Sequence, residues 1–354
     1  MKDEARRAGS CRLGSLLGAL FLAACFGDST EPLPPETAEV GVVLSSTDLS
    51  LTIFEVENPA QTRIVGLGPA GTPVTMAVRG NFAAVPLGIV SAVAVVDLKE
   101  GVRVRTVGLP TGSGATGAAF LNDSIVLVAN SDLNSVTPVN VLAGTLGSTI
   151  TVGRYPQAVV VEGGRAFVVN AELVDFAPAG PATVSVIDIE SLTVTSTIQL
   201  SGENAGPGGV GPDGRLYIVN TGSFDGSANG SLSVVNLTSL PEEVEHHTGF
   251  GDGPGSLALG PAGRAFVGAF SYGVAVWDTS LDAFIRGPAE ALRPGGSGVT
   301  GLAFDEAGRL YTLTADCVNP TTANRLDGTF AIDVTIPVGT CPIAIAFTTI
   351  EEEN

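Results

Sequence analysis

The fold is decided by residues 152–200, VGRYPQAVVVEGGRAFVVNAELVDFAPAGPATVSVIDIESLTVTSTIQL. This stretch contains four short runs rich in Val, Ile and Thr, separated by Gly, Pro, Asn or Asp, which is typical of antiparallel strands joined by tight turns. The second run is almost continuously apolar, whereas the last alternates, so we expect a covered inner strand and a half-wetted outer strand. The runs are Gln157–Val161, Arg165–Asn170, Thr183–Ile189 and Leu192–Leu200.

The same unit recurs along the chain, because two sequence markers stay in phase. One sheet of four strands cannot bury both of its faces, so copies of the unit must stack. A four-stranded repeat of about 45 residues is the signature of a propeller blade. The second strand of successive copies ends at Ser46, Pro86, Asn130, Asn170, Asn220, Ala269 and Thr314. The third strand ends near an acid or amide at Glu55, Asp97, Asn140, Asp188, Asn236, Asp278 and Asp327.

The two ends of the repeat predict how the ring closes. The first copy, from Val40, contains only three strands, and a surplus strand at Pro342–Phe347 follows the seventh copy. Pairing this strand with the first copy would leave no blade incomplete. The sequence therefore predicts an all-β, seven-bladed β-propeller of four-stranded antiparallel blades, closed by a C-terminal strand. It occupies residues 40–349, and residues 350–354 form an acidic tail.

Several stretches resemble a known repeat family. VGRYPQAVVV, GRAFVVN and VSVIDIESLTVTSTIQL are similar to the YVTN repeat of bacterial and archaeal surface propellers, which in turn resemble lactonase-like propellers. The resemblance covers roughly residues 40–348. It implies a seven-bladed propeller outside the cytoplasm, and it implies no particular reaction, because one fold hosts many functions.

The N-terminal residues are expected to target the chain to the cell envelope. Residues 1–24 combine a basic start with a short apolar run, as in a signal peptide. The sequence Leu22-Ala23-Ala24-Cys25 resembles the lipobox of bacterial lipoproteins, which predicts lipid attachment at Cys25; an ordinary secretory signal is the alternative. The residue after the lipobox cysteine is Phe26. An Asp at this position would favour retention in the inner membrane, so Phe26 favours the outer membrane. Residues 25–39 are acidic and Pro-rich, which predicts a flexible tether.

The amino-acid composition limits the classes of partner that the protein can bind. The 354 residues carry a net charge of −19 at pH 7, so a phosphate backbone would be repelled and nucleic acid is excluded as a partner. Besides the membrane reached through the lipid, the expected partner is a protein or a small-molecule ligand, and the propeller is expected to be monomeric. Cys317 and Cys341 remain after signal cleavage and are predicted to form a disulfide, with two free thiols as the alternative.

The candidate binding residues lie in the loops between the second and third strands of the blades. These loops vary greatly in length, and long loops gathered on one face of a rigid ring often carry binding sites. Three asparagines at the roots of the loops could instead serve their own turns, because Asn bonds readily to nearby backbone. The candidate set is Asn130, Asn170, Asp175, Phe176, Asn220, Phe224, Asp225, Asp316 and Asn319.

The sequence favours a role other than catalysis. His246 and His247 are consecutive in an outer strand and should point to opposite faces, so they cannot easily bind one metal together. The glycine-rich stretch 206–211 enters a strand with no helix behind it, which excludes a dinucleotide site. A single tryptophan, Trp277, argues against the quinoprotein propellers. We therefore assign no catalytic residue, metal or cofactor.

These observations predict an envelope lipoprotein that acts as a binding or scaffold propeller through its variable loops. One alternative is a lactonase-like hydrolase acting on a small cyclic ester at the mouth of the central channel, an analogy of fold alone. The second alternative is a structural component of a surface layer.

Overall fold

The structure is a computed structural model that describes residues 37–224, 229–239, 241–296 and 298–351. The predicted signal peptide, almost all of the predicted tether and the lipid site Cys25 lie outside the described residues, as does Asp225. Within the described part of the chain, no helix is long and apolar enough to cross a membrane.

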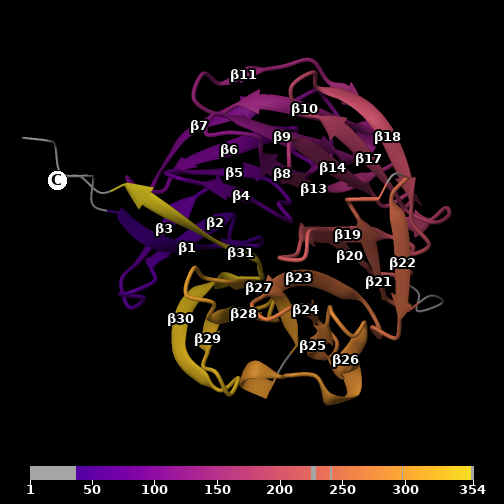
Figure 1. The fold of residues 1–354 in the computed structure, drawn as a ribbon. Helices are drawn as coiled ribbons and strands as arrows, with labels where there is room; N and C mark the ends of the chain where they lie inside the picture. Colours follow the sequence, from indigo (N-terminus) through magenta and orange to yellow (C-terminus); the bar gives the residue numbers. More distant parts are fainter. Residues whose placement is uncertain (1–36, 225–228, 240, 297, 352–354) are drawn as a thin grey trace, which may run out of the picture. The chain divides into compact units, whose positions relative to one another are not determined.

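Seven antiparallel sheets form the blades of a propeller, which confirms the predicted fold class (Figure 1). From the inner to the outer strand, sheet 1 consists of β31 (Pro342–Glu351), β1 (Thr37–Ser45), β2 (Ser50–Glu55) and β3 (Thr62–Gly66), and sheet 2 of β4 (Ala77–Arg79), β5 (Phe82–Pro86), β6 (Ala92–Asp97) and β7 (Val102–Gly108). Sheet 3 consists of β8 (Ala115–Phe120), β9 (Ile125–Asn130), β10 (Ser135–Asn140) and the short β11 (Thr145–Leu146) and β12 (Ile150–Thr151). Sheet 4 consists of β13 (Pro156–Glu162), β14 (Arg165–Asn170), β17 (Thr183–Asp188) and β18 (Thr193–Gln199).

The remaining blades follow the same order, and we call the four strands of each blade a to d from the inside outward. Sheets 5 to 7 are β19 (Ala205–Val210), β20 (Arg215–Asn220), β21 (Ser231–Asn236) and β22 (Glu243–Thr248); β23 (Pro254–Gly260), β24 (Arg264–Ala269), β25 (Gly273–Asp278) and β26 (Ala283–Arg286); and β27 (Val299–Phe304), β28 (Leu310–Thr314), β29 (Pro320–Leu326) and β30 (Ile332–Thr340). Within the described ranges, three single-turn 3₁₀ helices lie in the connections: Ser131–Leu133, Pro288–Glu290 and Pro294–Gly296.

The cores lie between neighbouring blades, which explains why strand b is apolar throughout. In blade 4, Phe167 and Val169 pack with Leu216 of blade 5, whereas Val168 packs with Leu127 of blade 3. All of these side chains are fully buried. Because successive side chains of a strand point to opposite faces, one apolar strand supplies two adjacent cores.

The ring closes as the two ends of the sequence predict. The C-terminal strand β31 pairs with β1 in antiparallel register, with Val40 opposite Thr348 and Val43 opposite Ile345. Inner strands of adjacent blades pack side by side around the whole ring, from β4 through β8, β13, β19, β23 and β27 to β31 (Figure 1). Cys317 and Cys341 are joined by the predicted disulfide, which links the b–c loop of blade 7 to the entry of the closing strand.

Two outer strands depart from the simple pattern. In blade 4, Val186 pairs with Ser196 but Ile187 pairs with Val194, so the register shifts at Thr195. Val194 is exposed, although the alternation of the sequence predicts that it is covered. In blade 3 the outer strand is divided into β11 and β12. The division lies opposite Pro138, which has no backbone N–H to offer an outer neighbour.

Candidate functional site

The loops that join strands b and c lie at one end of the ring, together with the connections from strand d to the next strand a. We call these b–c loops together the b–c face. The acids and amides that end strand c lie at the other end, in the c–d turns. There, Asp188 accepts hydrogen bonds from the N–H and hydroxyl of Ser191, and Asp278 does so from Ser280, as expected of structural turn formers.

Exposed apolar side chains recur on the b–c face. Six of the seven b–c loops carry at least one large apolar residue that is more than two-fifths exposed. They are Ile89 (79%), Leu133 (41%), Val174 (47%), Phe176 (68%), Phe224 (69%), Phe270 (63%) and Val318 (84%). Scattered surface apolar residues need no explanation, but their recurrence at one end of the ring makes that end the candidate interaction surface.

The longest described b–c loop displays two of the predicted residues at its tip. In blade 4, the short strands β15 (Leu173–Val174) and β16 (Ala177–Pro178) form a hairpin with Asp175 and Phe176 between them. Both tip residues have positive φ, 50° and 63°, as a tight two-residue hairpin turn requires. This conformation is rare for an aromatic residue, and it holds the ring of Phe176 out at the apex.

A groove of about 340 Å³ lies beside this hairpin, between the b–c loops of blades 3 and 4. Its walls include Asp132, Tyr155, Asp175 and Phe176. The rings of Tyr155 and Phe176 meet edge to face, with centroids 6.1 Å apart. Burial raises the pKa of the Tyr155 hydroxyl, and the negative charge of Asp132 raises it further, so this hydroxyl stays protonated. The groove thus combines aromatic walls with two carboxylates and one guanidinium, that of Arg154.

The three candidate asparagines do not reach the surface, which corrects their place in the binding set. Asn130, Asn170 and Asn220 are completely buried. Each side-chain amide donates to two hydroxyls of strand c in its own blade; Asn170 donates to Thr183 Oγ1 at 3.0 Å and to Ser185 Oγ at 3.1 Å. A buried amide must satisfy its donors within the protein, and these donors are satisfied locally. The asparagines therefore support the loops from beneath.

The other candidates lie where the sequence places them. Phe224 is exposed in the b–c loop of blade 5, next to the undescribed Asp225. In blade 7, Asp316 accepts hydrogen bonds from the backbone N–H groups of Val318 and Asn319 and from the amide of Asn319, which lowers the pKa of Asp316. Asp316 thus shapes the loop that presents Val318.

The centre of the ring offers less chemistry. A cavity of about 310 Å³ lies among the inner strands. The residues that line it are small or apolar apart from Thr75 and Gln157, and none of them titrates. The glycines of the stretch 206–211 belong here, because Gly206 and Gly208 are part of β19 and line this cavity.

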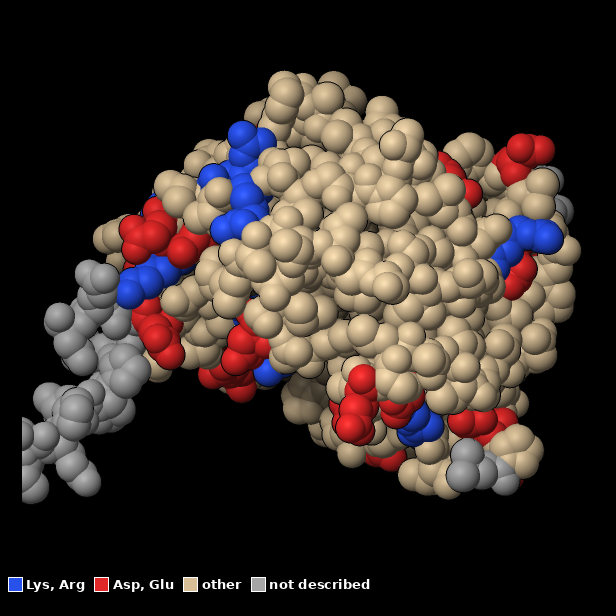
Figure 2. Space-filling model, turned by 90° about the horizontal axis from the view of Figure 1, so that it is seen from above, with Lys and Arg blue, Asp and Glu red and all other residues tan. Residues whose placement is uncertain are grey.

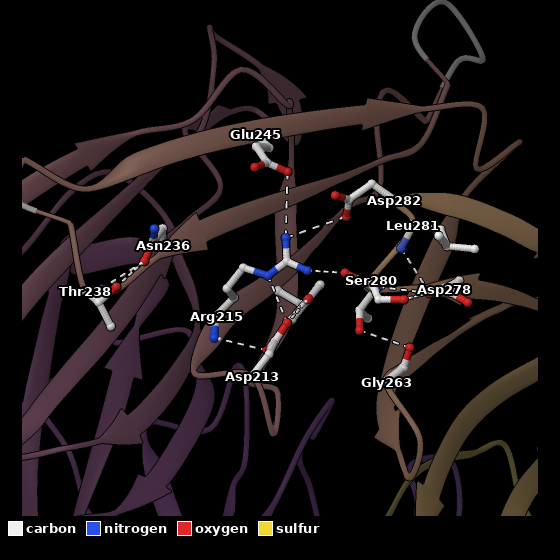
Figure 3. Close-up of polar contacts among 12 residues, drawn as sticks. Asp213, Arg215, Asn236, Thr238, Glu245, Gly263, Asp278, Ser280, Leu281 and Asp282 are labelled. Atoms are coloured by element: carbon white, nitrogen blue, oxygen red, sulfur yellow. Dashed lines mark hydrogen bonds and ion pairs between the residues drawn. The ribbon is translucent and has the colours of Figure 1, made fainter.

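A cluster of ionisable groups lies at the outer rim between blades 5 and 6 (Figure 3). The Arg215 guanidinium lies between three carboxylates: Nε is 2.8 Å from Asp213, and Nη1 is 3.8 Å from Glu245 and 3.6 Å from Asp282. Nε2 of His247 lies 3.4 Å from Glu245 Oε2 and 3.9 Å from Asp282 Oδ1. Glu245, His247 and Asp282 could hold a metal ion, since each has a ligand atom within 4.8 Å of the others.

Sequence reasoning identified Phe176 and Phe224, but it missed the recurrence of exposed apolar residues across the b–c face, and it missed the rim cluster. The apolar residues of the b–c face have a recurring signal, because Ile89, Leu133, Val174, Phe224 and Val318 all stand three or four residues after strand b ends. In the rim cluster, Glu245 and His247 are two residues apart on one strand and therefore share a face. Asp282 comes from the neighbouring blade, and nothing in the local sequence indicates that it meets them.

Comparison with known proteins supports the fold alone. No family model matches the chain, and neither does any curated protein. Among solved structures, hydrazine synthase of Kuenenia stuttgartiensis is similar, with a TM-score of 0.61 and 15% sequence identity over 76% of this chain and 87% of that chain. At this identity, the likeness shows a shared seven-bladed β-propeller and carries no activity across.

Proposed function

We propose that this protein is a binding or scaffold propeller of the bacterial cell envelope, lipid-anchored through Cys25, which holds a partner on its b–c face. The recurrence of exposed apolar residues on six b–c loops carries this proposal. Apolar anchors at the centre of a contact surface supply most of the binding free energy in protein complexes.

The charges of the same loops indicate the chemistry of the partner. The described residues of the b–c loops include five acids and no Lys or Arg; the acids are Asp48, Asp132, Glu172, Asp175 and Asp316. A complementary partner is a protein segment with apolar side chains flanked by Lys or Arg. A cationic side chain would enter this groove, where two aromatic rings and two carboxylates favour a positive charge and one guanidinium, that of Arg154, opposes it.

The uncharged part of the surface is compatible with the role of a binding or scaffold protein. Figure 2 shows a broad uncharged area, with acidic and basic side chains lying together in several clusters toward the margins of the view. Only 15% of the residues are charged, although acids outnumber bases by 36 to 17. A few acidic groups beside apolar ones can therefore decide which partners bind.

A cross-linking experiment on intact cells tests the proposal with a matched control. The full-length lipoprotein would be compared with a triple variant of the b–c face, Ile89→Ser, Phe176→Ser and Phe224→Ser. The control is Leu281→Ser, which removes a 75% exposed apolar side chain from a c–d turn at the other end of the ring. We expect cross-links to a defined protein at b–c loop positions, retained in the control and reduced about tenfold or more in the triple variant. Equal recovery from both variants would refute the b–c face as the binding surface.

The alternatives have less support from the geometry. A lactonase-like hydrolase would need acid or base groups at the central channel, and the residues that line the central cavity do not titrate. A surface-layer component would assemble with itself, which light scattering of the purified protein over a concentration series would detect. Membership of the YVTN-repeat family remains a prediction from the repeat sequence.

A further inference from the structure

We propose that the rim cluster between blades 5 and 6 is a binding site for a divalent transition-metal ion of the Zn²⁺ type. The ligands are Nε2 of His247 and one carboxylate oxygen each of Glu245 and Asp282. The site is separate from the b–c face, since Asp282 lies in the c–d turn of blade 6 and Glu245 and His247 lie on the outer strand of blade 5.

The first argument is geometric. Metal–ligand bonds of about 2.0–2.1 Å place tetrahedral ligand atoms about 3.3 Å apart. The His247 nitrogen already lies 3.4 Å from Glu245 Oε2 and 3.9 Å from Asp282 Oδ1. All three ligand atoms lie within 4.8 Å of one another, so small side-chain rotations complete the set. Imidazole combined with two carboxylates suits a transition metal better than Ca²⁺ or Mg²⁺, which take oxygen ligands.

The second argument is that two of these ligand atoms make no hydrogen bond, although Asp282 Oδ1 lies 3.6 Å from the Arg215 guanidinium. Among the described residues, the buried Nε2 of His247 and the buried Oδ1 of Asp282 have no hydrogen-bond partner. Buried polar atoms are usually hydrogen-bonded, and here two atoms that lack a hydrogen bond lie 3.9 Å apart, where one ion could contact both. The imidazole is held in place by Trp277, a nearly buried residue whose ring centroid lies 4.8 Å away.

The third argument concerns charge. Three carboxylates surround one guanidinium, which leaves the group of Asp213, Glu245, Asp282 and Arg215 with a net charge of −2. A divalent cation would neutralise that excess, with His247 as a neutral ligand. The presence of Arg215 does not block the site, because its hydrogen bonds go to Asp213 and to the backbone carbonyl of Thr279. Its Nη1 forms longer ion pairs with Glu245 Oε2 at 3.8 Å and Asp282 Oδ1 at 3.6 Å, which are drawn as dashed lines in Figure 3.

The site would join two blades where the sheets themselves do not. Each sheet ends at its outer strand, so blades 5 and 6 share no strand pairing at the rim. An ion held by β22 of one blade and the c–d turn of the next would link them there. Three protein ligands leave a fourth position for water.

The test uses the full-length protein in detergent, treated with chelator and titrated with Zn²⁺ by calorimetry and with Co²⁺ by visible absorption. We expect one ion per chain, Co²⁺ bands of a four- or five-coordinate site, and a rise in melting temperature on addition of Zn²⁺. His247→Ala should weaken binding about tenfold or more.

The matched control is His246→Ala, which removes the adjacent imidazole from the opposite face of the same strand and should leave binding unchanged. Because His247→Ala could disturb packing against Trp277, the isosteric variants Asp282→Asn and Glu245→Gln serve as a second test, and both should weaken binding. The proposal is overturned if the unmodified protein binds no ion, if His246→Ala and His247→Ala reduce binding equally, or if Asp282→Asn and Glu245→Gln bind normally.

Discussion

At the residue scale, the buried asparagines show how a propeller blade fixes the start of its variable loop. In blades 3, 4 and 5, an amide at the end of strand b donates to the first and third residues of strand c. Blade 7 reverses the arrangement, because Asn324 of strand c donates to Thr314 at the end of strand b. A Cβ atom added at Gly153 would collide with the amide of Asn170, so the preceding connection is closely packed on it.

Replacing one of these asparagines should therefore destabilise the ring without touching its surface. Asn170→Ala removes the amide donor from the hydroxyls of Thr183 and Ser185, of which Ser185 keeps the backbone N–H of Gly153 as a donor, and we expect a loss of about 2 kcal/mol in the free energy of unfolding. Chemical denaturation monitored by circular dichroism measures this. Asn319→Ala, at an exposed loop position, should change stability by less than about 0.5 kcal/mol. Similar losses in the two variants would contradict a structural role that is specific to the buried amide.

At the scale of elements, closure combines one strand and one covalent bond. Strand β31 completes blade 1, and the Cys317–Cys341 disulfide fixes the chain immediately before that strand. The bond closes a loop with a sequence separation of 24 residues that contains β29 and β30. Loss of this cross-link frees the connection in the unfolded chain and loosens the entry of β31 in the folded one.

The double variant Cys317→Ser, Cys341→Ser should lower the free energy of unfolding by about 3 kcal/mol in the chain-entropy model. Thermal denaturation with and without reductant measures the loss. Reductant should lower the melting temperature of the unmodified protein toward that of the variant and leave the variant itself unchanged. A variant that melts with the oxidised protein would show that the bond adds nothing to closure.

The elements also show what the sequence could reveal and what it could not. Strand number, blade count, closure and the disulfide follow from local signals such as RAFVVN and the surplus strand 342–347, because each depends on spacing along the chain. The Thr195 bulge and the divided outer strand of blade 3 depend on how neighbours pair. Burial of Asn170 and the meeting of His247 with Asp282 depend on packing between strands and between blades, which no window of sequence contains.

At the scale of the whole molecule, acidic side chains in turns give the protein a defined response to acid. Hydrogen bonds from Ser191 lower the pKa of Asp188, and those from Ser280 and Thr329 lower the pKa values of Asp278 and Asp327. A carboxyl whose pKa is lower in the folded state adds stability above its unfolded value, near 3.9, and that stability is lost as the pH falls through the folded value.

We therefore expect the free energy of unfolding to decline as the pH drops below about 4. Glu39 acts in the opposite direction, because burial raises its pKa, but it is one group against several. Urea denaturation at a series of pH values measures the dependence. Asp278→Asn, which keeps the turn acceptor but cannot titrate, should show a shallower decline. Stability that increases below pH 4 would contradict the prediction.

The pairing of β1 with β31 also cannot form until the ribosome has synthesised almost the whole chain. About 300 residues separate the two strands, and at a ribosomal rate of 5–20 residues per second the second emerges on the order of half a minute after the first. Throughout that interval one edge of β1 has no neighbour, and an open strand edge is a template for pairing with another chain. During synthesis the protein therefore depends on another factor to cover the open edge of β1 until β31 has been made.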